Sequence, residues 1–401
     1  MGPEWGAVYR LSCYIDAEVD PALLDAALAR ALRRFPFFAV SLRRGLFWFY
    51  HEALDGHPPV RPESPVPCAM PGADDNDEFL FRVVYYRNRI SLELFHSLTD
   101  GTGALCFLKT LVACYFAGLG EPIEAIEGVL DPDEPPRAEE AEDAFVRFAR
   151  EAEGGSFAEG RAYNLPGPVL APPALRIVSG AMDARRLSSL AKERSTTVTG
   201  LLAALLMLAY DEVQREEDGV PQLPVKIQIP VNMRKFHPTR SLRNFSLFAN
   251  SALPLSELPP SLEEAVAAAT EGMRTGHDPE ALERMMSLNV ATERSAALRP
   301  VPLALKRAAL KAAYSVVGDN QFTCALSNLG AQKLPPGLAA HVSRFDFVLG
   351  RSRVPCVNLG VVGYGENLVA TLTSNVEGRG VERAFFRRLA GLGLRVVVDS
   401  N

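Results

Sequence analysis

The stretch FHSLTDGTG, residues 95–103, decides the fold that we predict for this chain. It follows a segment, Arg89–Phe95, in which apolar and polar residues alternate as they do in a half-buried strand. It precedes an apolar segment, 104–116, that has the length and composition of a helix. Two glycines in the stretch permit a sharp turn between strand and helix. The sequence therefore predicts that His96 stands at a strand end, where an imidazole can be presented into a cleft.

The spacing of apolar residues in the rest of the chain predicts many strands mixed with helices and no regular βαβ alternation. This pattern indicates an α+β architecture. Asp20 followed by Pro21 is typical of a helix start, and Asp183 is a second expected helix cap. Residue 118 to residue 173 is predicted as loop around one short helix, 141–152. The expected strands are 7–19, 45–51, 79–86, 89–95, 175–180, 225–231, 322–327, 342–349, 357–364 and 368–374. The other expected helices are 104–116, 199–213, 262–274, 282–317 and 381–394.

A chain of 401 residues exceeds the usual size of one domain, so two domains are expected. The character of the sequence changes in the middle, where residues 121–159 hold 13 acidic and 3 basic residues. We therefore divide the chain into an N-terminal half, 1–120, an acidic linker or excursion, 121–173, and a C-terminal half, 174–401. Long acidic and Pro/Gly-rich stretches are typical of surface segments rather than of core.

The composition is that of a globular protein, with 48% hydrophobic and 22% charged residues and a net charge of −6. This balance argues against a nucleic-acid partner, because binding phosphates needs a basic face. The N-terminus lacks the features of a secretory signal, and the longest apolar run, 200–210, is too short to span a bilayer. We expect no transmembrane segment and a cytoplasmic location. The cysteines are expected to be buried in a reducing compartment, and they are Cys13, Cys68, Cys106, Cys114, Cys324 and Cys356.

The stretch at 95–103 resembles the HHxxxDG motif of the superfamily that contains chloramphenicol acetyltransferase, peptide-synthetase condensation domains and alcohol acyltransferases. It is most similar to the alcohol acetyltransferase and condensation-like branch. Phe95 occupies the position of the first histidine, and His96 that of the second. Further segments of the chain occur in the order expected from the resemblance, and they are RRFPFF, PVNMRK, SLRNFSLF, SNLG, RFDFVLG and LTSNVEG.

The resemblance implies two chloramphenicol acetyltransferase-like α/β sandwich halves around a central tunnel. It implies that His96 is the general base, removing a proton from an alcohol or amine while that group attacks a thioester carbonyl. It further implies no bound cofactor, with acyl-CoA or an acyl-carrier thioester as co-substrate and a small molecule as acceptor.

Other positions of the motifs receive supporting roles through the same resemblance. Asp100 is expected to be structural and to form a salt bridge with Arg234, with Lys235 and Arg243 ranked after it as partners. Gly101 and Gly103 would let an acyl chain or pantetheine pass close to the backbone. The oxyanion donors are expected to be Ser327 and Asn328 of the SNLG segment, although both could instead be ordinary turn formers.

Two other interpretations stay open at this point, and two more are disfavoured. A metal site built on His96 and Asp100 is disfavoured, because His237, His277 and His341 show no ligand spacing. The chain could be a condensing partner that takes its donor from an acyl carrier protein. It could also be a condensation-like binding protein that has lost turnover, since Phe95 replaces the first histidine. Hydrolase chemistry is disfavoured because the sequence has no GxSxG motif.

Overall fold

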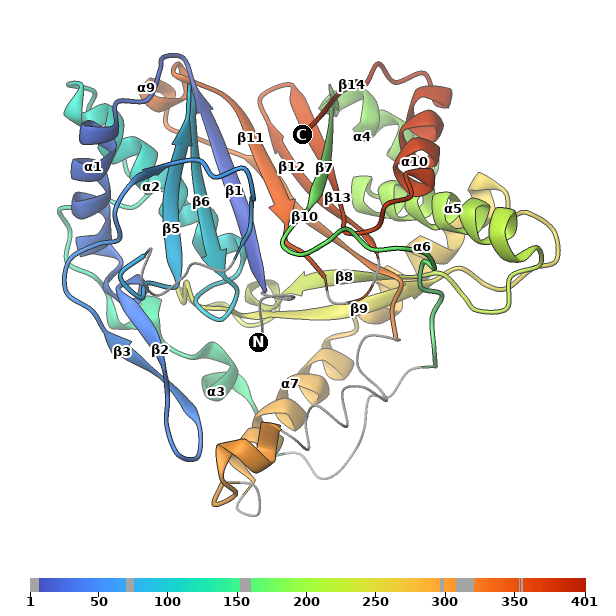
Figure 1. The fold of residues 1–401 in the computed structure, drawn as a ribbon, viewed down its shortest axis with the longest axis horizontal. Helices are drawn as coiled ribbons and strands as arrows, with labels where there is room; N and C mark the ends of the chain where they lie inside the picture. The colour runs from blue at the N-terminus through green and yellow to red at the C-terminus, as the bar shows by residue number, and fades with distance from the viewer. Residues whose placement is uncertain are drawn as a thin grey trace.

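The computed structural model describes residues 7–69, 76–151, 160–295, 299–307, 321–352, 354 and 356–401. In these residues, helices and strands form two lobes that lie side by side (Figure 1). Each lobe holds one large sheet with helices against it, so the architecture is mixed α/β and two-lobed, as the sequence predicted.

The strands of the first half are β1 (Val8–Ile15), β2 (Val40–Arg44), β3 (Phe49–Ala53), β4 (Arg61–Pro62), β5 (Phe81–Tyr86) and β6 (Arg89–Phe95). With β11 (Val342–Leu349), four of them form a five-stranded sheet in the order β11-β1-β6-β5-β4. Strands β1 and β6 are antiparallel, and their register sets Tyr9 opposite Leu94. The remaining two, β2 and β3, form a separate hairpin that projects from the N-terminal lobe (Figure 1).

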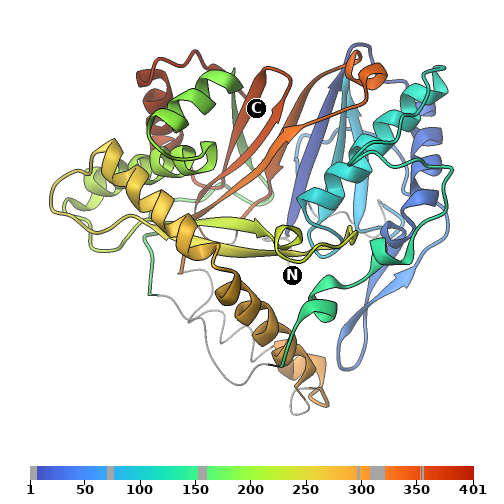
Figure 2. The same cartoon turned by 180° about the vertical axis from the view of Figure 1, so that it is seen from behind.

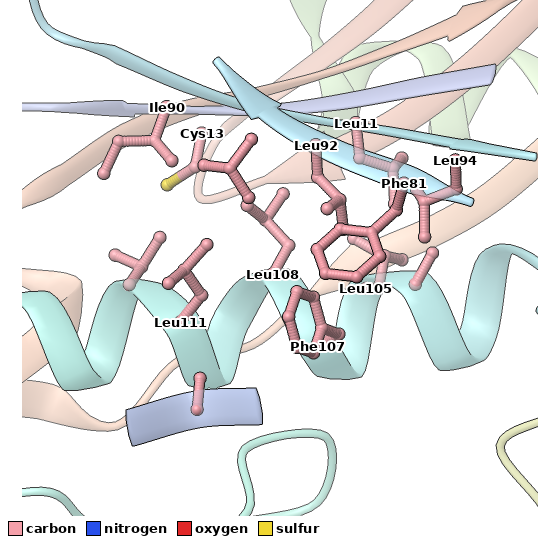
Figure 3. Close-up of a cluster of buried hydrophobic side chains, with 14 of the residues drawn as sticks. Leu11, Cys13, Phe81, Ile90, Leu92, Leu94, Leu105, Phe107, Leu108 and Leu111 are labelled. Carbon is pink, nitrogen blue, oxygen red and sulfur yellow. The ribbon is translucent and has the colours of Figure 1, made fainter. Parts of the chain in front are cut away.

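Helices α1 (Pro21–Arg34) and α2 (Gly101–Gly118) cover one face of this sheet, and the short η1 (Pro36–Phe38) follows α1. Asp20 caps α1 as predicted, since its Oδ1 accepts the N–H groups of Ala22 and Leu23. Figure 3 shows Leu105, Phe107 and other side chains of α2 meeting those of β1, β5 and β6 in a buried apolar cluster. This packing fixes the first turn of α2 relative to the end of β6.

The second half contributes β7 (Arg176–Asp183), β8 (Lys226–Asn232), β9 (Ser246–Ala252), β10 (Cys324–Gln332), β12 (Val357–Tyr364), β13 (Asn367–Ser374) and β14 (Val397–Ser400). They form a seven-stranded sheet in the order β14-β7-β13-β12-β10-β8-β9. The helices around it are α4 (Ala184–Glu193), α5 (Val198–Asp218), α6 (Leu262–Gly276), α7 (Pro279–Arg294), α9 (Pro336–Ala339) and α10 (Gly380–Gly391). Most of α5 is buried, in the core of the C-terminal lobe.

Two segments from the second half of the chain join the lobes. Strand β11 comes from the second half but pairs antiparallel with β1 in the N-terminal sheet. It also lies against the C-terminal sheet, because a Cβ on Gly360 of β12 would meet the Phe347 carbonyl oxygen of β11 at 2.3 Å. The β8–β9 hairpin extends in the other direction, from the C-terminal sheet beneath the N-terminal lobe (Figure 2). The chain between β8 and β9, which includes η3 (Met233–Lys235), reaches the end of β6.

The acidic middle segment contains η2 (Ala138–Ala141) and α3 (Ala144–Phe148) in its described part. One carboxylate of the segment is buried: Glu140 pairs with Arg34 at the end of α1, and Nη2 of Arg34 donates at 2.7 Å. The Glu140 carbonyl accepts the N–H of Leu242 from the β8–β9 connection. The segment is therefore fastened to both halves of the chain, while the boundaries that we predicted for the halves stay a prediction.

Several expected elements differ from the structure. The helix predicted over 141–152 is shorter, because it begins at Ala144 and ends at Phe148. The helix predicted from 282 to 317 is not continuous: α7 ends at Arg294, and Pro300 and Pro302 separate it from helical residues whose described part is 303–307. The rest of that predicted helix, 308–317, lies outside the described residues. Strands β2, β4, β9 and β14 had not been predicted.

Helix α2 is the one described helix that, taken singly, is long and apolar enough to cross a bilayer. A share of 78% of it is buried inside the protein, between α1 and the N-terminal sheet. Helices α4 and α5 pass the same test only if they are taken together, and they meet at an angle of 81°. Such burial is typical of a core helix.

Candidate active site

His96 is the first residue after β6, at the end of the N-terminal sheet that faces the β8–β9 connection. Its backbone N–H donates to the Ala7 carbonyl at 2.7 Å, which continues the pairing of β6 with β1 by one residue. Its side chain is exposed. Among the residues that the structure describes, neither imidazole nitrogen has a hydrogen-bond partner. The backbone of His96 is therefore held in the sheet, while its imidazole is exposed and makes no hydrogen bond to the described residues.

Tyr9 packs beside the imidazole. Its ring centroid lies 5.2 Å from that of His96, at an interplanar angle of 58°. The Tyr9 hydroxyl donates to the Thr99 carbonyl at 3.1 Å. Burial raises the pKa of this phenol well above its usual value, and the negative charge of Asp100 raises it further. Tyr9 thus remains a neutral donor that supports the turn on which His96 sits.

Phe95, at the position of the first histidine of the motif, is part of the hydrophobic core. Its side chain is 5% exposed and belongs to the N-terminal apolar core. It lies opposite Val8 in the β1–β6 pairing. The position before His96 is therefore a core position in this chain, and a large apolar side chain fills it.

Asp100 holds the turn after His96 in place. Its Oδ1 accepts the N–H groups of Thr102 and Gly103 at 3.0 and 3.2 Å, which caps the first turn of α2. Its Oδ2 accepts Nη1 of Arg234 at 2.7 Å and the N–H of Phe245 at 2.9 Å. The carboxylate is buried and receives four donors, so its charge is compensated from both lobes.

All three guanidinium nitrogens of Arg234 donate hydrogen bonds. Besides Asp100, its guanidinium donates from Nε to the Ser241 carbonyl at 2.9 Å and from Nη2 to the Arg243 carbonyl at 2.6 Å. The Lys235 side chain is exposed and makes none of these contacts. Arg234 therefore fixes the shape of the β8–β9 connection and joins it to the turn that carries His96.

Close backbone contacts complete the same junction. The Thr99 hydroxyl donates to the Leu242 carbonyl at 2.6 Å. A Cβ on Gly103 would lie 2.1 Å from that Leu242 oxygen, so only glycine fits there. A Cβ on Gly101 would lie 2.4 Å from Cδ2 of Leu329, a side chain of β10 that packs against the N-terminal core.

The two predicted oxyanion donors have different surroundings on β10. The amide of Asn328 donates to the Thr199 hydroxyl of α5 at 3.0 Å, and its Oδ1 accepts the N–H of Gly330 at 2.9 Å. The Ser327 hydroxyl has no hydrogen-bond partner among the described residues. Two residues further along β10, Leu329 contacts Gly101 of the N-terminal lobe, and the register of the strand shifts between Asn328 and Ala331.

The other histidines of the sequence analysis lie elsewhere. His237 packs on Phe148 with ring centroids 5.0 Å apart, and His277 is exposed at the end of α6. Nδ1 of His341 lies 2.7 Å from Asp16. Within the described ranges, no three His, Cys, Asp or Glu side chains are grouped so that they could hold a metal ion.

The contacts of Tyr9, Thr99 and Leu242 are the part of the site that sequence reasoning missed. The signal for Tyr9 was present, since it lies in the expected opening strand, but only the register of β1 against β6 sets it beside His96. Thr99 and Leu242 act mainly through backbone oxygens, which a sequence pattern does not reveal.

Comparisons with known proteins agree with this fold. No family model matches the chain, and no curated protein matches it by sequence. Solved structures do match. TRI101 of F. sporotrichioides, in complex with coenzyme A and T-2, has a TM-score of 0.63 and 11% identity, and 98% of this chain and 97% of that chain are covered. The first condensation domain of the CDA synthetase gives 0.58 and 16%, over 98% and 91%.

Polyketide synthase associated protein 5 from Mycobacterium tuberculosis gives a TM-score of 0.59 and 14% identity, over 96% of this chain and 93% of that chain. All three likenesses extend over nearly the whole length of both chains. The predicted two-lobed fold of the condensation and CoA-dependent acyltransferase type is thus confirmed.

Proposed function

We propose that this chain is an acyltransferase that moves an acyl group from a thioester to an alcohol or amine, with His96 as general base. The observation that carries the proposal is the position of His96. Its imidazole is exposed at a strand end, and the turn behind it is held by Asp100 and Arg234 from opposite lobes. Such fixation suits a base that must meet an acceptor at one point.

The proposed step is a direct transfer. The acceptor hydroxyl or amine gives its proton to the imidazole as its oxygen or nitrogen bonds to the thioester carbonyl carbon. The tetrahedral oxyanion then collapses, the carbon–sulfur bond breaks, and the thiolate leaves and takes the proton back from the imidazolium. Ser327 is our candidate donor to the oxyanion, because its hydroxyl is uncommitted. Asn328 ranks after it, because its amide donates to Thr199.

Coenzyme A is our proposed carrier of the acyl group, and this is supported by the neighbour solved with that molecule. An acyl-carrier thioester is the alternative, supported by the likeness to a condensation domain. We further propose a cytoplasmic location, since all six cysteines are buried and none forms a disulfide.

The test measures thiol release. Purified protein is given a panel of acyl-CoAs with and without alcohols or amines, and free thiol is followed over time. We expect release that depends on the acceptor and that falls about 10²–10⁴-fold in His96→Ala. His277→Ala is the matched control, because that histidine is exposed and far along the chain on the end of α6.

The panel also separates the alternatives. Release from an acyl-carrier protein but from no acyl-CoA would assign the donor to the carrier and reject coenzyme A. A folded protein that is stabilised by ligands but releases no thiol from either donor would contradict the transferase proposal and favour a binding protein.

A further inference from the structure

The tip of the β2–β3 hairpin is an exposed apolar surface that the proposed reaction does not use. Leu46 is 72% exposed, Phe47 45%, Trp48 47% and Tyr50 53%. These four side chains lie within five consecutive positions, on a hairpin that projects away from the N-terminal lobe (Figure 1). Scattered exposed apolar residues are ordinary, but a contiguous group of aromatic ones marks an interaction site.

The backbone of this tip is firmly held. Within the turn, the N–H of Gly45 donates to the Trp48 carbonyl at 2.9 Å. From the second half of the chain, the N–H of Leu303 donates to the Leu46 carbonyl at 2.8 Å. Lys306 donates from Nζ to the Phe47 carbonyl at 3.0 Å and lies 4.6 Å from the centroid of the Trp48 ring. The anchoring uses main-chain oxygens, so the apolar side chains remain directed outward.

The short helix at 303–307 extends the surface, because Leu305 is 62% exposed beside this anchor. Cations surround the apolar residues, while the carboxylates in contact with them, Glu52 and Glu78, both pair with Arg43. The protein as a whole carries a net charge of −6, so this local excess of positive charge stands out. The exposed cations are Arg44, Arg299 and Arg307. Arg43 is taken up by its two carboxylate partners, and Lys306 is buried with its Nζ on the Phe47 and Arg299 carbonyls.

We propose that this hairpin tip docks on an anionic lipid surface. Tryptophan and tyrosine prefer the boundary between lipid headgroups and acyl chains, and neighbouring cations are attracted to anionic headgroups. The shape favours lipid over a protein partner: a convex tip presents little area to a rigid surface, whereas a bilayer deforms around it. A protein partner or a second copy of the chain would instead be expected to cover a flatter face.

The tip is connected to the site described above. The hairpin strand β3 carries His51, and burial together with the positive charge of Arg243 lowers the pKa of that histidine. Arg243 belongs to the β8–β9 connection, where its carbonyl accepts Nη2 of Arg234. The base of this hairpin therefore lies near the β8–β9 connection that carries Arg234.

Trp48 is a built-in probe of this docking. The chain has two tryptophans, so Trp5→Phe leaves Trp48 as the single one. The full-length protein is mixed with phosphatidylcholine vesicles and, separately, with equimolar phosphatidylcholine–phosphatidylglycerol vesicles. We expect Trp48 emission to move to shorter wavelength with the anionic vesicles, and lipids with brominated acyl chains to quench it.

Variants then assign the binding to the tip. We expect Leu46→Ser with Phe47→Ser to weaken co-sedimentation with the anionic vesicles at least about tenfold. The matched control is Leu255→Ser with Leu258→Ser, two exposed leucines on the C-terminal lobe, which should leave binding unchanged. All four positions are exposed, so the melting temperature verifies that each variant is folded.

Three results would overturn the proposal. The first is an unchanged Trp48 spectrum with anionic vesicles at low salt. The second is equal binding of the tip variant and of its control, or equal binding to both kinds of vesicle. The third is concentration-dependent dimerisation that the tip substitutions abolish, since the apolar tip would then be a protein interface. None of these readouts depends on turnover, so they stand apart from the test of His96.

Discussion

Asp100 at the start of α2 and Arg234 after β8 form an ion pair that spans the two lobes, with Oδ2 2.7 Å from Nη1. The carboxylate is buried and the guanidinium is nearly so. Each group also holds backbone of its own lobe: Asp100 caps α2, and Arg234 gathers two carbonyls of the β8–β9 connection. The pair is thus a structural joint directly behind the proposed base.

We expect removal of either partner to leave a buried charge uncompensated. Asp100→Ala and Arg234→Ala should each lower the free energy of unfolding by about 3–5 kcal/mol. The double variant should lose much less than the sum of the two, because both single variants break the same interaction. Chemical denaturation of the four proteins measures this. Arg274→Ala, which breaks an exposed pair with Glu271, is the control and should leave the free energy of unfolding nearly unchanged. Additive losses would show that the two side chains act independently.

The substitutions Gly103→Ala and Gly101→Ala can be compared directly, because each adds one methyl group to the first turn of α2. The new methyl at 103 would meet the Leu242 carbonyl oxygen at 2.1 Å, and backbone cannot give way cheaply. The methyl at 101 would meet only the end of the Leu329 side chain, which can rotate. We expect Gly103→Ala to cost about 3 kcal/mol and Gly101→Ala about 1 kcal/mol or less, as measured by urea denaturation. Equal costs would contradict the close approach of the β8–β9 connection to α2.

Substitutions of Ser327 and Asn328 should affect different properties. Replacing Ser327 should lower activity, and replacing Asn328 should lower stability. If Ser327 donates to the oxyanion, Ser327→Ala lowers kcat by about 10²–10³-fold and leaves the melting temperature nearly unchanged. Asn328→Ala loses the bonds to Thr199 and Gly330 and should lower the free energy of unfolding by about 1 kcal/mol. Thr199→Val is the control, since it breaks the same bond from the other side. The reverse pattern would move the oxyanion role to Asn328.

The stability conferred by Glu140 should depend on pH in a defined direction. Burial alone would raise the pKa of this carboxyl, but hydrogen bonds from Arg34 and from the N–H of Arg137 outweigh burial and lower it. A lowered folded-state pKa means that the carboxylate stabilises the protein above the ordinary glutamate pKa, about 4.3. That stabilisation is lost as the pH falls through the lower folded-state value.

The measurement is urea denaturation of the wild type and of Glu140→Gln as a function of pH. We expect a difference of about 3 kcal/mol at neutral pH that closes below about pH 4. Arg34→Met removes the ion-pair partner of Glu140. In that background we expect Glu140→Gln to change the free energy of unfolding less over the same pH range. A difference that is constant with pH would mean that the carboxylate charge contributes nothing.

Much of the fold could be predicted because its elements are locally encoded. Strands β6 and β11 have the bounds that alternation predicts, and Asp20 and Asp183 cap helices as expected. The failures have physical causes. The helix predicted through 282–317 was read from apolar spacing across Pro300 and Pro302, which interrupt it. Strand β2 was missed because it is short and belongs to a hairpin with little buried apolar area.

The site was predictable only in part. The motif set His96 at a strand end, which the structure bears out, and the resemblance suggested the contact between Asp100 and Arg234 that is present. The contact between Tyr9 and His96 could not be predicted in this way. It depends on the register of β1 against β6, which the hydrophobic periodicity of the sequence does not specify. The catalytic role of His96 and the donor role of Ser327 stay predictions.

Strand β11 has a consequence for how the molecule is made. Because the outer edge of β1 is completed by residues near the end of the chain, Tyr9 of the nascent protein must wait for Leu349 to leave the ribosome. Until then the amino-terminal lobe carries an open strand edge, which is a hazard for aggregation. Folding of this lobe therefore waits for the synthesis of residues 342–349, and a fragment that ends before Val342 would retain a vacant edge able to accept a synthetic peptide of the β11 sequence.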